Sequence, residues 1–288
     1  MLRMSTGSNC DGIELATKYY YQRDVMSRLL IVGDVHGMIE PLQALIYELA
    51  IQPGDTLVFV GDLIDKGPDS AGVVRYVERL RNDSACEIVV VEGNHEDRMR
   101  RYLRNYRVRP AIAREQSDRA PELLVLQKQL ALEETPFLDW SVPFFRCSKY
   151  GVLVVHGGIP GTMRNFPESV QEAQTLVGRN AKKFEKILRT RFIDAVSGEF
   201  LALGMQTLGD PFWAETYDGR FGHVVFGHQP FLEGPAEFPY ATGIDTGAVH
   251  GGGLTALVLS PDTPRRFISV RSECISPYVL DPVFLPER

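Results

Sequence analysis

The chain has 288 residues, of which 44% are hydrophobic and 24% charged, and its formal net charge is −6. That length suits one large domain or two small ones, and the apolar fraction excludes a disordered, collagen-like or disulfide-stapled chain. No apolar run in the sequence approaches the roughly 18–20 residues that cross a bilayer, so a membrane partner is not expected. The modest acidity argues against general nucleic-acid binding.

Residues 1–27 are predicted to be an N-terminal extension. They carry Asp11, Glu14 and Asp24 and lack an uninterrupted apolar core, so we do not expect a secretory signal there. The four cysteines are widely spaced without a CxxC pair, which is typical of reduced thiols in a cytosolic protein. We therefore predict a cytoplasmic protein with one domain over residues 28–288.

Short apolar runs alternate with helical patterns from residue 28 onward. The predicted elements of the first half are strands over Leu29–Val32, Thr56–Val60 and Ile88–Val91, and helices over Leu42–Leu49, Val73–Leu80 and Asp97–Arg107. Strand–helix–strand–helix–strand is the pattern of an α/β layered fold.

The second half is richer in strands. The predicted strands are Val152–Val155, Val224–Phe226, Thr255–Leu259 and Phe267–Val270. The charged segment 165–195 is predicted to be helical. A second sheet packed on the first is the economical architecture.

Five motifs directly follow predicted strands. They are Gly33-Asp34-Val35-His36-Gly37, Gly61-Asp62-Leu63-Ile64-Asp65-Lys66-Gly67, Gly93-Asn94-His95-Glu96, His156-Gly157-Gly158 and Gly227-His228. Ligands of α/β sheets bind beyond the carboxyl ends of the strands, so these motifs can converge on one site. Four of the six histidines lie inside the motifs, which a chance distribution would not produce.

The residue types in these motifs suit divalent metal ions. Carboxylate, amide and imidazole groups without thiolate are ligands for manganese, iron or zinc. One carboxylate can bridge two ions about 3.5–4 Å apart, which is the arrangement used in phosphoryl hydrolysis. A water bound to such ions loses its proton readily and becomes a nucleophile at neutral pH.

In this order, GDxHG, GDxxDxG, GNHE, HGG and GH resemble the PPP-type metallophosphoesterases. This family includes protein serine/threonine phosphatases, diadenosine tetraphosphatases and related ApaH-like phosphatases. The resemblance covers residues 28–259. It implies a central β-sandwich flanked by helices, and a dinuclear hydrolase that uses metal-bound hydroxide, with manganese as the favoured metal.

The resemblance also implies roles for individual residues. The implied metal ligands are Asp34 and His36 for the first ion, Asp62 as the bridge, and Asn94, His156 and His228 for the second ion. His95 would be the general acid that protonates the leaving oxygen, and Asp65 would orient its imidazole. The residues alone leave Asp65 open as a turn residue or a helix N-cap.

The second motif departs from that of the protein phosphatases, which normally ends in Asp-Arg-Gly. Here Asp65-Lys66-Gly67 is followed by Pro68 and Ser70, and this run resembles the ApaH-like phosphatases. Lys66 keeps the positive charge that can bind substrate phosphate, but it lacks the bidentate guanidinium of the arginine that it replaces. The alternative interpretation is that Lys66 is a solvated surface lysine. We therefore slightly favour a nucleotide or dinucleoside polyphosphate substrate. A serine/threonine phosphoprotein is the alternative, because the retained Asp65 is typical of protein phosphatases.

Several arginines are candidates to supply the bidentate guanidinium that Lys66 cannot provide. We rank Arg220 first because it precedes the Gly227-His228 motif closely, ahead of Arg179, Arg189 and Arg191. The segment 98–119 holds eight arginines against two acidic residues and begins just after the third motif. It is either a solvated helix face or a cationic rim that attracts a polyanionic substrate.

A catalytically silent metal-binding scaffold is the remaining alternative. The complete set of motif residues and the presence of His95 argue against it.

Overall fold

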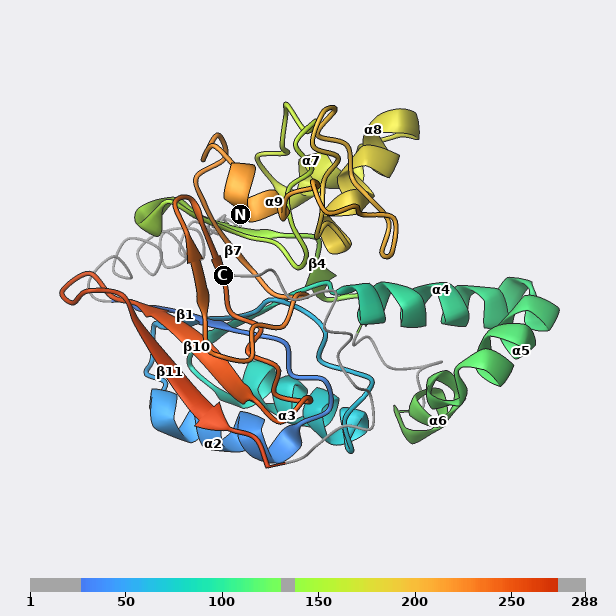
Figure 1. Cartoon of the computed structure of the whole chain (residues 1–288). Coiled ribbons are helices and arrows are strands. Elements are labelled where there is room, and N and C mark those ends of the chain that lie inside the picture. The colour runs from blue at the N-terminus through green and yellow to red at the C-terminus, as the bar shows by residue number, and fades with distance from the viewer. Residues whose placement is uncertain (1–26, 131–137, 274–288) are drawn as a thin grey trace, which may run out of the picture.

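The computed structural model describes residues 27–130 and 138–273 (Figure 1). Its elements in the first half are β1 (Leu29–Val32), α2 (Ile39–Leu49), β2 (Thr56–Phe59), α3 (Ser70–Asp83), β3 (Glu87–Val91), α4 (Asn94–Val108), α5 (Pro110–Arg119) and α6 (Pro121–Leu130). The second half begins with β4 (Ser141–Val142), β5 (Phe145–Cys147), the 3-10 helix η2 (Ser148–Tyr150), β6 (Val152–Val154), α7 (Val170–Gln174), α8 (Gly178–Phe184) and the 3-10 helix η3 (Glu185–Leu188). It ends with α9 (Trp213–Thr216), β7 (His223–Phe226), β8 (Ala236–Phe238), β9 (Ala241–Gly243), β10 (Gly253–Leu259) and β11 (Arg266–Arg271).

The first sheet has the order β11-β10-β1-β2-β3-β4. Strands β1, β2, β3 and β4 are parallel neighbours, whereas β10 runs antiparallel to β1 and β11 antiparallel to β10. The carboxyl ends of the parallel strands meet at one edge of the sheet, and the first three motifs begin there.

The second sheet has the order β5-β6-β7-β9-β8. Its central strands β6, β7 and β9 are parallel, so their carboxyl ends also share one edge. The fourth and fifth motifs follow β6 and β7 at this edge.

Alternating side chains along the strands join the two sheets into a sandwich. In β1, Leu29 and Ile31 belong to the apolar layer between the sheets, and Leu30 and Val32 face the helices. In β7, Val225 lies in the same central layer, while its neighbours pack on the opposite face of the second sheet. Side chains alternate between the two faces of a strand, and both faces of these strands are buried. This explains the continuous apolar runs in the sequence.

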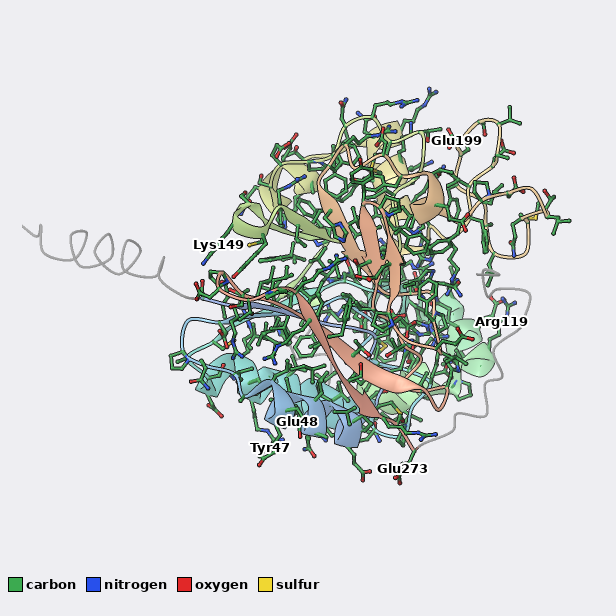
Figure 2. The ribbon with its side chains drawn as sticks, turned by 60° about the vertical axis from the view of Figure 1, so that its left-hand side comes forward. Tyr47, Glu48, Arg119, Lys149, Glu199 and Glu273 are labelled. Carbon is green, nitrogen blue, oxygen red and sulfur yellow. The ribbon has the colours of Figure 1, made fainter. Side chains whose placement is uncertain are left out.

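Helices cover both outer faces of the sandwich (Figure 1). Helices α2 and α3 pack on the first sheet through apolar residues at helical spacing, and Asp69 caps α3 by accepting from the backbone N–H of Gly72 at 2.7 Å. Tyr47 and Glu48 project from the opposite face of α2 into solvent (Figure 2). Helix α4 runs away from the sandwich and leads into α5 and α6.

The layered α/β class and the β-sandwich are confirmed, as are the seven predicted strands and three predicted helices, with ends that move by up to three residues. The prediction of a helical segment over 165–195 is confirmed only in part. Helices α7 and α8 and the 3-10 helix η3 form there, but Pro167 precedes the first of them and the residues between α7 and α8 and after η3 are not helical. Of the predicted extension, only Ser27 lies within the described residues. No described helix combines the length and apolar character that a membrane crossing requires.

Candidate active site

The loops that carry the motifs adopt an unusual backbone conformation. Six non-glycine residues in the described ranges have positive φ, and five of them lie in the motifs. These five are His36 (46°), Asp62 (51°), Asp65 (70°), Lys66 (65°) and His228 (69°). Left-handed conformations of side-chain-bearing residues are costly and cluster at functional sites, so the packing around these loops holds them in place.

Two motif glycines allow a close approach between loops. A Cβ atom at Gly93 would lie 2.1 Å from Asp62 Oδ1, and a Cβ atom at Gly227 would lie 1.9 Å from Asp34 Oδ1. Any other residue at either position would displace a carboxylate of the site. These glycines are therefore required by the site geometry.

Asp34, His36 and Asp62 lie together at the end of the first sheet, and all three are buried. His36 Nδ1 is 2.9 Å from the carbonyl of Ile64, so this nitrogen donates and Nε2 presents its lone pair to the site. His36 Nε2 lies 3.9 Å from Asp34 Oδ2 and 3.5 Å from Asp62 Oδ2. This set offers two carboxylates and one imidazole to a cation.

The second set shares Asp62 with the first and adds Asn94 from the start of α4 and two histidines that follow strands of the second sheet. His156 Nδ1 lies 3.0 Å from the carbonyl of Val60, which leaves Nε2 facing Asp62 Oδ2 at 3.3 Å and Asn94 Oδ1 at 3.1 Å. His228 Nε2 is buried without a hydrogen-bond partner among the described residues. The ligand atoms of Asp62, His156 and His228 lie within 4.8 Å of one another. Asp62 Oδ2 thus lies between the two sets, where a bridging ligand belongs.

The electrostatics of the cluster favour bound cations. Burial, together with the charges of Asp245 and Asp62, raises the pKa of Asp34 well above its usual range. Burial also opposes ionisation of Asp62, but the neighbouring His156 and His95 outweigh it and hold the pKa of that carboxyl well below its usual range. Burial lowers the pKa of His228, so its imidazole is held neutral, as a metal ligand must be. Buried carboxylates close to one another, beside the neutral imidazole of His228, fit divalent metal ions.

His95 lies at the edge of the cluster and is more exposed than the buried histidines. Its Nδ1 is 2.6 Å from Asp65 Oδ2, and Arg98 donates to the same oxygen at 2.6 Å. His95 Nε2 lies 3.8 Å from Asp62 Oδ2 and faces the site. His95, His36 and Asp62 also form a group of close ligand atoms, so geometry alone permits His95 as a ligand.

The motif pattern predicts no role for Glu96, although this residue belongs to the third motif. Its buried carboxylate accepts backbone N–H groups of Asp62 at 2.8 Å, Leu63 at 2.9 Å and Gly93 at 2.9 Å. It thereby fastens the second motif to the third. A glutamate in the first turn of a helix that follows a strand was the available signal.

Asp245 is a second residue that sequence reasoning missed. It is buried beside Asp34, and its Oδ1 accepts the backbone N–H of Gly247 at 3.0 Å. It follows β9 just as the motif residues follow their strands, so the same rule identifies it.

The two predicted substrate-binding residues lie in different places. Lys66 Nζ is 2.9 Å from His36 Nε2, within the cluster. The structure does not bring Arg220 to the cluster, contrary to the prediction. Its guanidinium donates to Asp218 at 2.7 Å and to the carbonyl of Met163 at 3.3 Å, because a short turn folds it back on its own loop.

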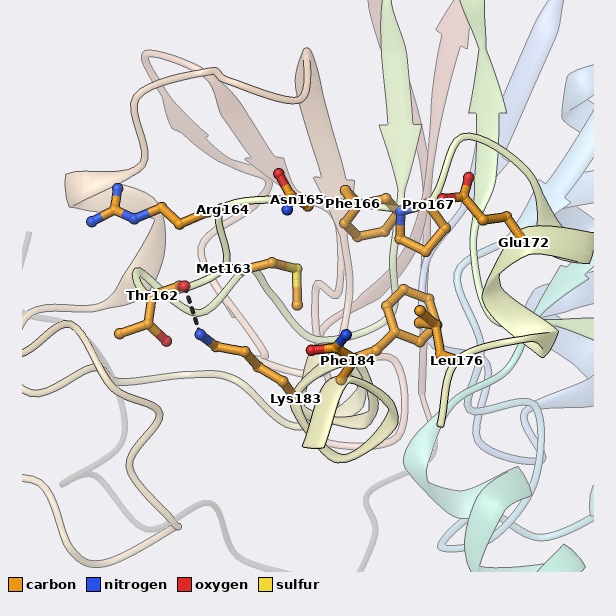
Figure 3. A pocket seen from close by; sticks show the side chains of 11 residues that line it. Thr162, Met163, Arg164, Asn165, Phe166, Pro167, Glu172, Leu176, Lys183 and Phe184 are labelled. Carbon is orange, nitrogen blue, oxygen red and sulfur yellow. Dashed lines mark hydrogen bonds between the residues drawn. The ribbon is translucent and has the colours of Figure 1, made fainter. Parts of the chain in front are cut away.

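Met163 lines a separate cavity of about 210 Å³ (Figure 3). There Lys183 Nζ donates to the carbonyl of Thr162 at 2.8 Å. This cavity contains none of the motif residues.

Arg191 lies where Arg220 was expected. It donates to the carbonyl of His228 at 2.6 Å, and its charge interacts with Asp245, Asp62 and Asp34. Its Nε is buried without a hydrogen-bond partner among the described residues, so this N–H remains able to bond a ligand.

The comparisons with known proteins agree with this geometry. The sequence profile of the calcineurin-like phosphoesterase family matches residues 27–245, which include all five motifs. A relative from Oceanobacillus iheyensis, described as the asymmetrical bis(5'-nucleosyl)-tetraphosphatase PrpE, is 28% identical over 253 residues, which cover 84% of this chain and 91% of the relative. A relative from Azotobacter vinelandii, described as a symmetrical bis(5'-nucleosyl)-tetraphosphatase, is 27% identical over 273 residues, which cover 81% of this chain and 94% of the relative.

A solved structure of similar fold belongs to a protein provisionally described as a diadenosine tetraphosphatase. It is 28% identical to this chain and has a TM-score of 0.61. The superposition covers 86% of this chain and 95% of that protein.

Proposed function

The chain belongs to the calcineurin-like phosphoesterase family, and on that premise we propose that it hydrolyses dinucleoside polyphosphates at a two-metal centre. The class of reaction, hydrolysis of phosphate esters or anhydrides, follows from the family. The observation that carries the proposal is the position of Asp62 Oδ2, 3.5 Å from His36 Nε2 and 3.3 Å from His156 Nε2. A carboxylate oxygen at that point can serve both cations.

The residues that would hold the ions are those of the two sets. They are Asp34, His36 and Asp62 for one ion, and Asp62, Asn94, His156 and His228 for the other. Manganese is our choice, with iron or zinc as alternatives, because the set contains no thiolate. When bound, two such ions supply Lewis acidity to the phosphoryl group and acidify the attacking water.

His95 holds the proton that the leaving oxygen needs. Asp65 binds its Nδ1–H and stabilises the positive imidazole, so that the second proton is carried on Nε2, on the side of the cluster. Arg98 keeps the Asp65 carboxylate in place. The greater exposure of His95 favours a role toward substrate over a role as ligand.

Lys66 and Arg191 are the proposed phosphate anchors. The Lys66 ammonium group donates a hydrogen bond to the lone pair of His36 Nε2. That lone pair cannot accept from an ammonium group and bind a cation at the same time. Lys66 therefore turns away when His36 ligates a cation, and its ammonium becomes available to a phosphate oxygen. Arg191 replaces Arg220 in this role, since its unpaired Nε lies beside the cluster.

Two features favour a nucleotide over a phosphoprotein as the substrate. The relatives described as bis(5'-nucleosyl)-tetraphosphatases align over 91% and 94% of their own lengths, and the Lys-Gly-Pro-x-Ser run is present at residues 66–70. The His95–Asp65 pair keeps phosphoprotein hydrolysis as the second candidate function. The proposal places the catalytic domain at residues 28–288, after an extension of residues 1–27, in a cytoplasmic protein.

A side-by-side rate comparison tests the proposal. With manganese supplied, diadenosine tetraphosphate, inorganic polyphosphate and a phosphoseryl peptide are compared by kcat/KM. We expect the highest value for diadenosine tetraphosphate. A higher value for the phosphopeptide would transfer the assignment to the second candidate. Stoichiometric metal without hydrolysis of any of these or of an aryl phosphate would indicate a silent scaffold.

A further inference from the structure

A second cavity, of about 370 Å³, opens beside α4. Four arginines line it, Arg100, Arg101 and Arg104 from α4 and Arg189 from the residue after η3. Asp97 and Glu185 are the only acidic residues in its lining. Cations therefore outnumber acids two to one around this cavity.

The arginines of α4 share one face of the helix. Asp97, Arg100, Arg101 and Arg104 follow the spacing i, i+3, i+4 and i+7, which places them side by side. The buried residues of the helix, among them Met99 and Leu103, form another face. Like charges at this spacing destabilise a helix, so the arrangement has a cost that anion binding would offset.

The ion pairs within the cavity leave part of its positive charge unneutralised. Asp97 Oδ2 serves two arginines at once, Arg189 at 2.5 Å and Arg101 at 3.2 Å. Arg100 is held at 2.7 Å by Glu92, outside the cavity. Arg104 is exposed and takes part in no ion pair among the described residues. Arg101 and Arg104 are thus the guanidinium groups that are most available to an anion.

The cavity borders the candidate active site on two elements. Helix α4 begins at Asn94, and Asp97 lies one turn further along. On the other side, the backbone nitrogen of Arg189 is so close to Gly157 that a Cβ atom there would lie 2.8 Å from it. Arg101 and Arg104 follow Asn94 by about 11 and 15 Å along the helix axis, at a rise of about 1.5 Å per residue. Asn94 shares the helix face of Asp97 and Arg101 at spacing i, i+3 and i+7. A chain of phosphates that starts at the cluster and extends along α4 would meet Arg101 and Arg104.

We propose that this cavity binds the phosphates of a nucleoside polyphosphate that lie beyond the one being hydrolysed. The inference rests on the proposed function, because it assigns a further subsite to the same substrate. Guanidinium groups bind phosphate oxygens bidentately, which suits several phosphates in a row. A small phosphomonoester does not reach this cavity, so the cavity distinguishes long substrates from short ones.

The kinetic test uses Arg101→Gln/Arg104→Gln with Arg107→Gln as the matched control. Arg107 is an exposed arginine of the same helix outside the cavity lining. We expect the double change to raise KM for diadenosine tetraphosphate by about 5- to 30-fold more than KM for nitrophenyl phosphate, from roughly 1–2 kcal/mol of charge-assisted bonding. The difference should shrink as salt rises. Equal effects on both substrates, or the same effect from Arg107→Gln, would overturn the subsite.

A binding test keeps the subsite separate from the proposed function. Calorimetric titration with inorganic tripolyphosphate should give at least a fivefold weaker Kd for the double variant than for the wild type and Arg107→Gln. Equal binding by all three proteins overturns the subsite even if diadenosine tetraphosphate is hydrolysed. If that dinucleotide is not hydrolysed but the binding difference is present, the proposed function fails and the anion site stands.

The mode of inhibition by tripolyphosphate distinguishes a subsite for the substrate's own phosphates from a site for a free oligophosphate. Tripolyphosphate should inhibit diadenosine tetraphosphate hydrolysis competitively. Noncompetitive inhibition would mean that a free oligophosphate regulates the enzyme there, and would also overturn the subsite.

Discussion

Asp65→Asn tests whether Asp65 acts through His95. The carboxylate of Asp65 is buried and lies 2.6 Å from His95 Nδ1, so it can stabilise a positive imidazole through a charge-assisted hydrogen bond. The variant keeps an oxygen acceptor of the same size but removes the negative charge. Arg98 retains Glu122 at 2.8 Å, so the change does not leave that guanidinium unpaired.

The expected loss follows from the strength of that bond. A hydrogen bond to a charged group contributes about 1.5–3 kcal/mol and a neutral one about 0.5–1.5 kcal/mol, a difference of roughly 1–2 kcal/mol. At 1.36 kcal/mol for each factor of ten, kcat should fall by about 5- to 30-fold. His95→Asn removes the proton donor itself and should cost about 10²–10⁴ in rate.

The assay compares kcat for phenyl phosphate and nitrophenyl phosphate. Nitrophenol leaves with little protonation, so both variants should lose less activity on it. Asp83→Asn, which changes an exposed carboxylate at the end of α3, is the control and should not alter either rate. Equal losses on good and poor leaving groups would refute the proton-transfer role of His95 and the positioning role of Asp65.

Three further predictions concern metal content, stability and pH. Asp62→Asn removes the charge that lets two cations lie close together, and elemental analysis should find clearly fewer than two metal ions per chain; two tightly held ions would contradict the bridge. Asp55→Asn should lower the free energy of unfolding by about 2–4 kcal/mol in urea, because Asp55 is buried and pairs with Arg28 at 2.5 Å. Glu115→Gln breaks an ion pair of the same length that is exposed, and should cost less than about 0.5 kcal/mol; similar losses for the two would show that burial is not the deciding factor. Burial raises the pKa of the Cys86 thiol from 9.0 to about 11, so the thiol ionises at lower pH in the unfolded chain than in the folded one. The free energy of unfolding should therefore fall between about pH 9 and 11, and it should fall less steeply in Cys86→Ala. Identical slopes of unfolding free energy against pH in the two proteins would refute this assignment.

The composition of the site was largely predictable from sequence, because its residues obey a short-range rule. Asp34, Asp62 and His156 each follow a buried strand within two or three residues, and parallel strands bring their carboxyl ends to one edge. The same rule extends to Asp245 after β9. The segment 165–195 shows where a pattern of charged and apolar residues alone was insufficient, since only α7, α8 and η3 form within it.

The roles of the arginines depended on the tertiary structure. Arg220 is closer in sequence to the fifth motif than Arg191, but its turn pairs it with Asp218, whereas Arg191 reaches the carbonyl of His228 across 37 residues of chain. Likewise, Arg98 serves Asp65 while Arg104 lines a cavity, although both belong to one charged helix. The sequence by itself determined which groups follow the strands, because that is a local property of the chain. Only the packing of two sheets and their loops decided which long side chains reach the site, because a flexible arginine is positioned by partners that are distant in sequence.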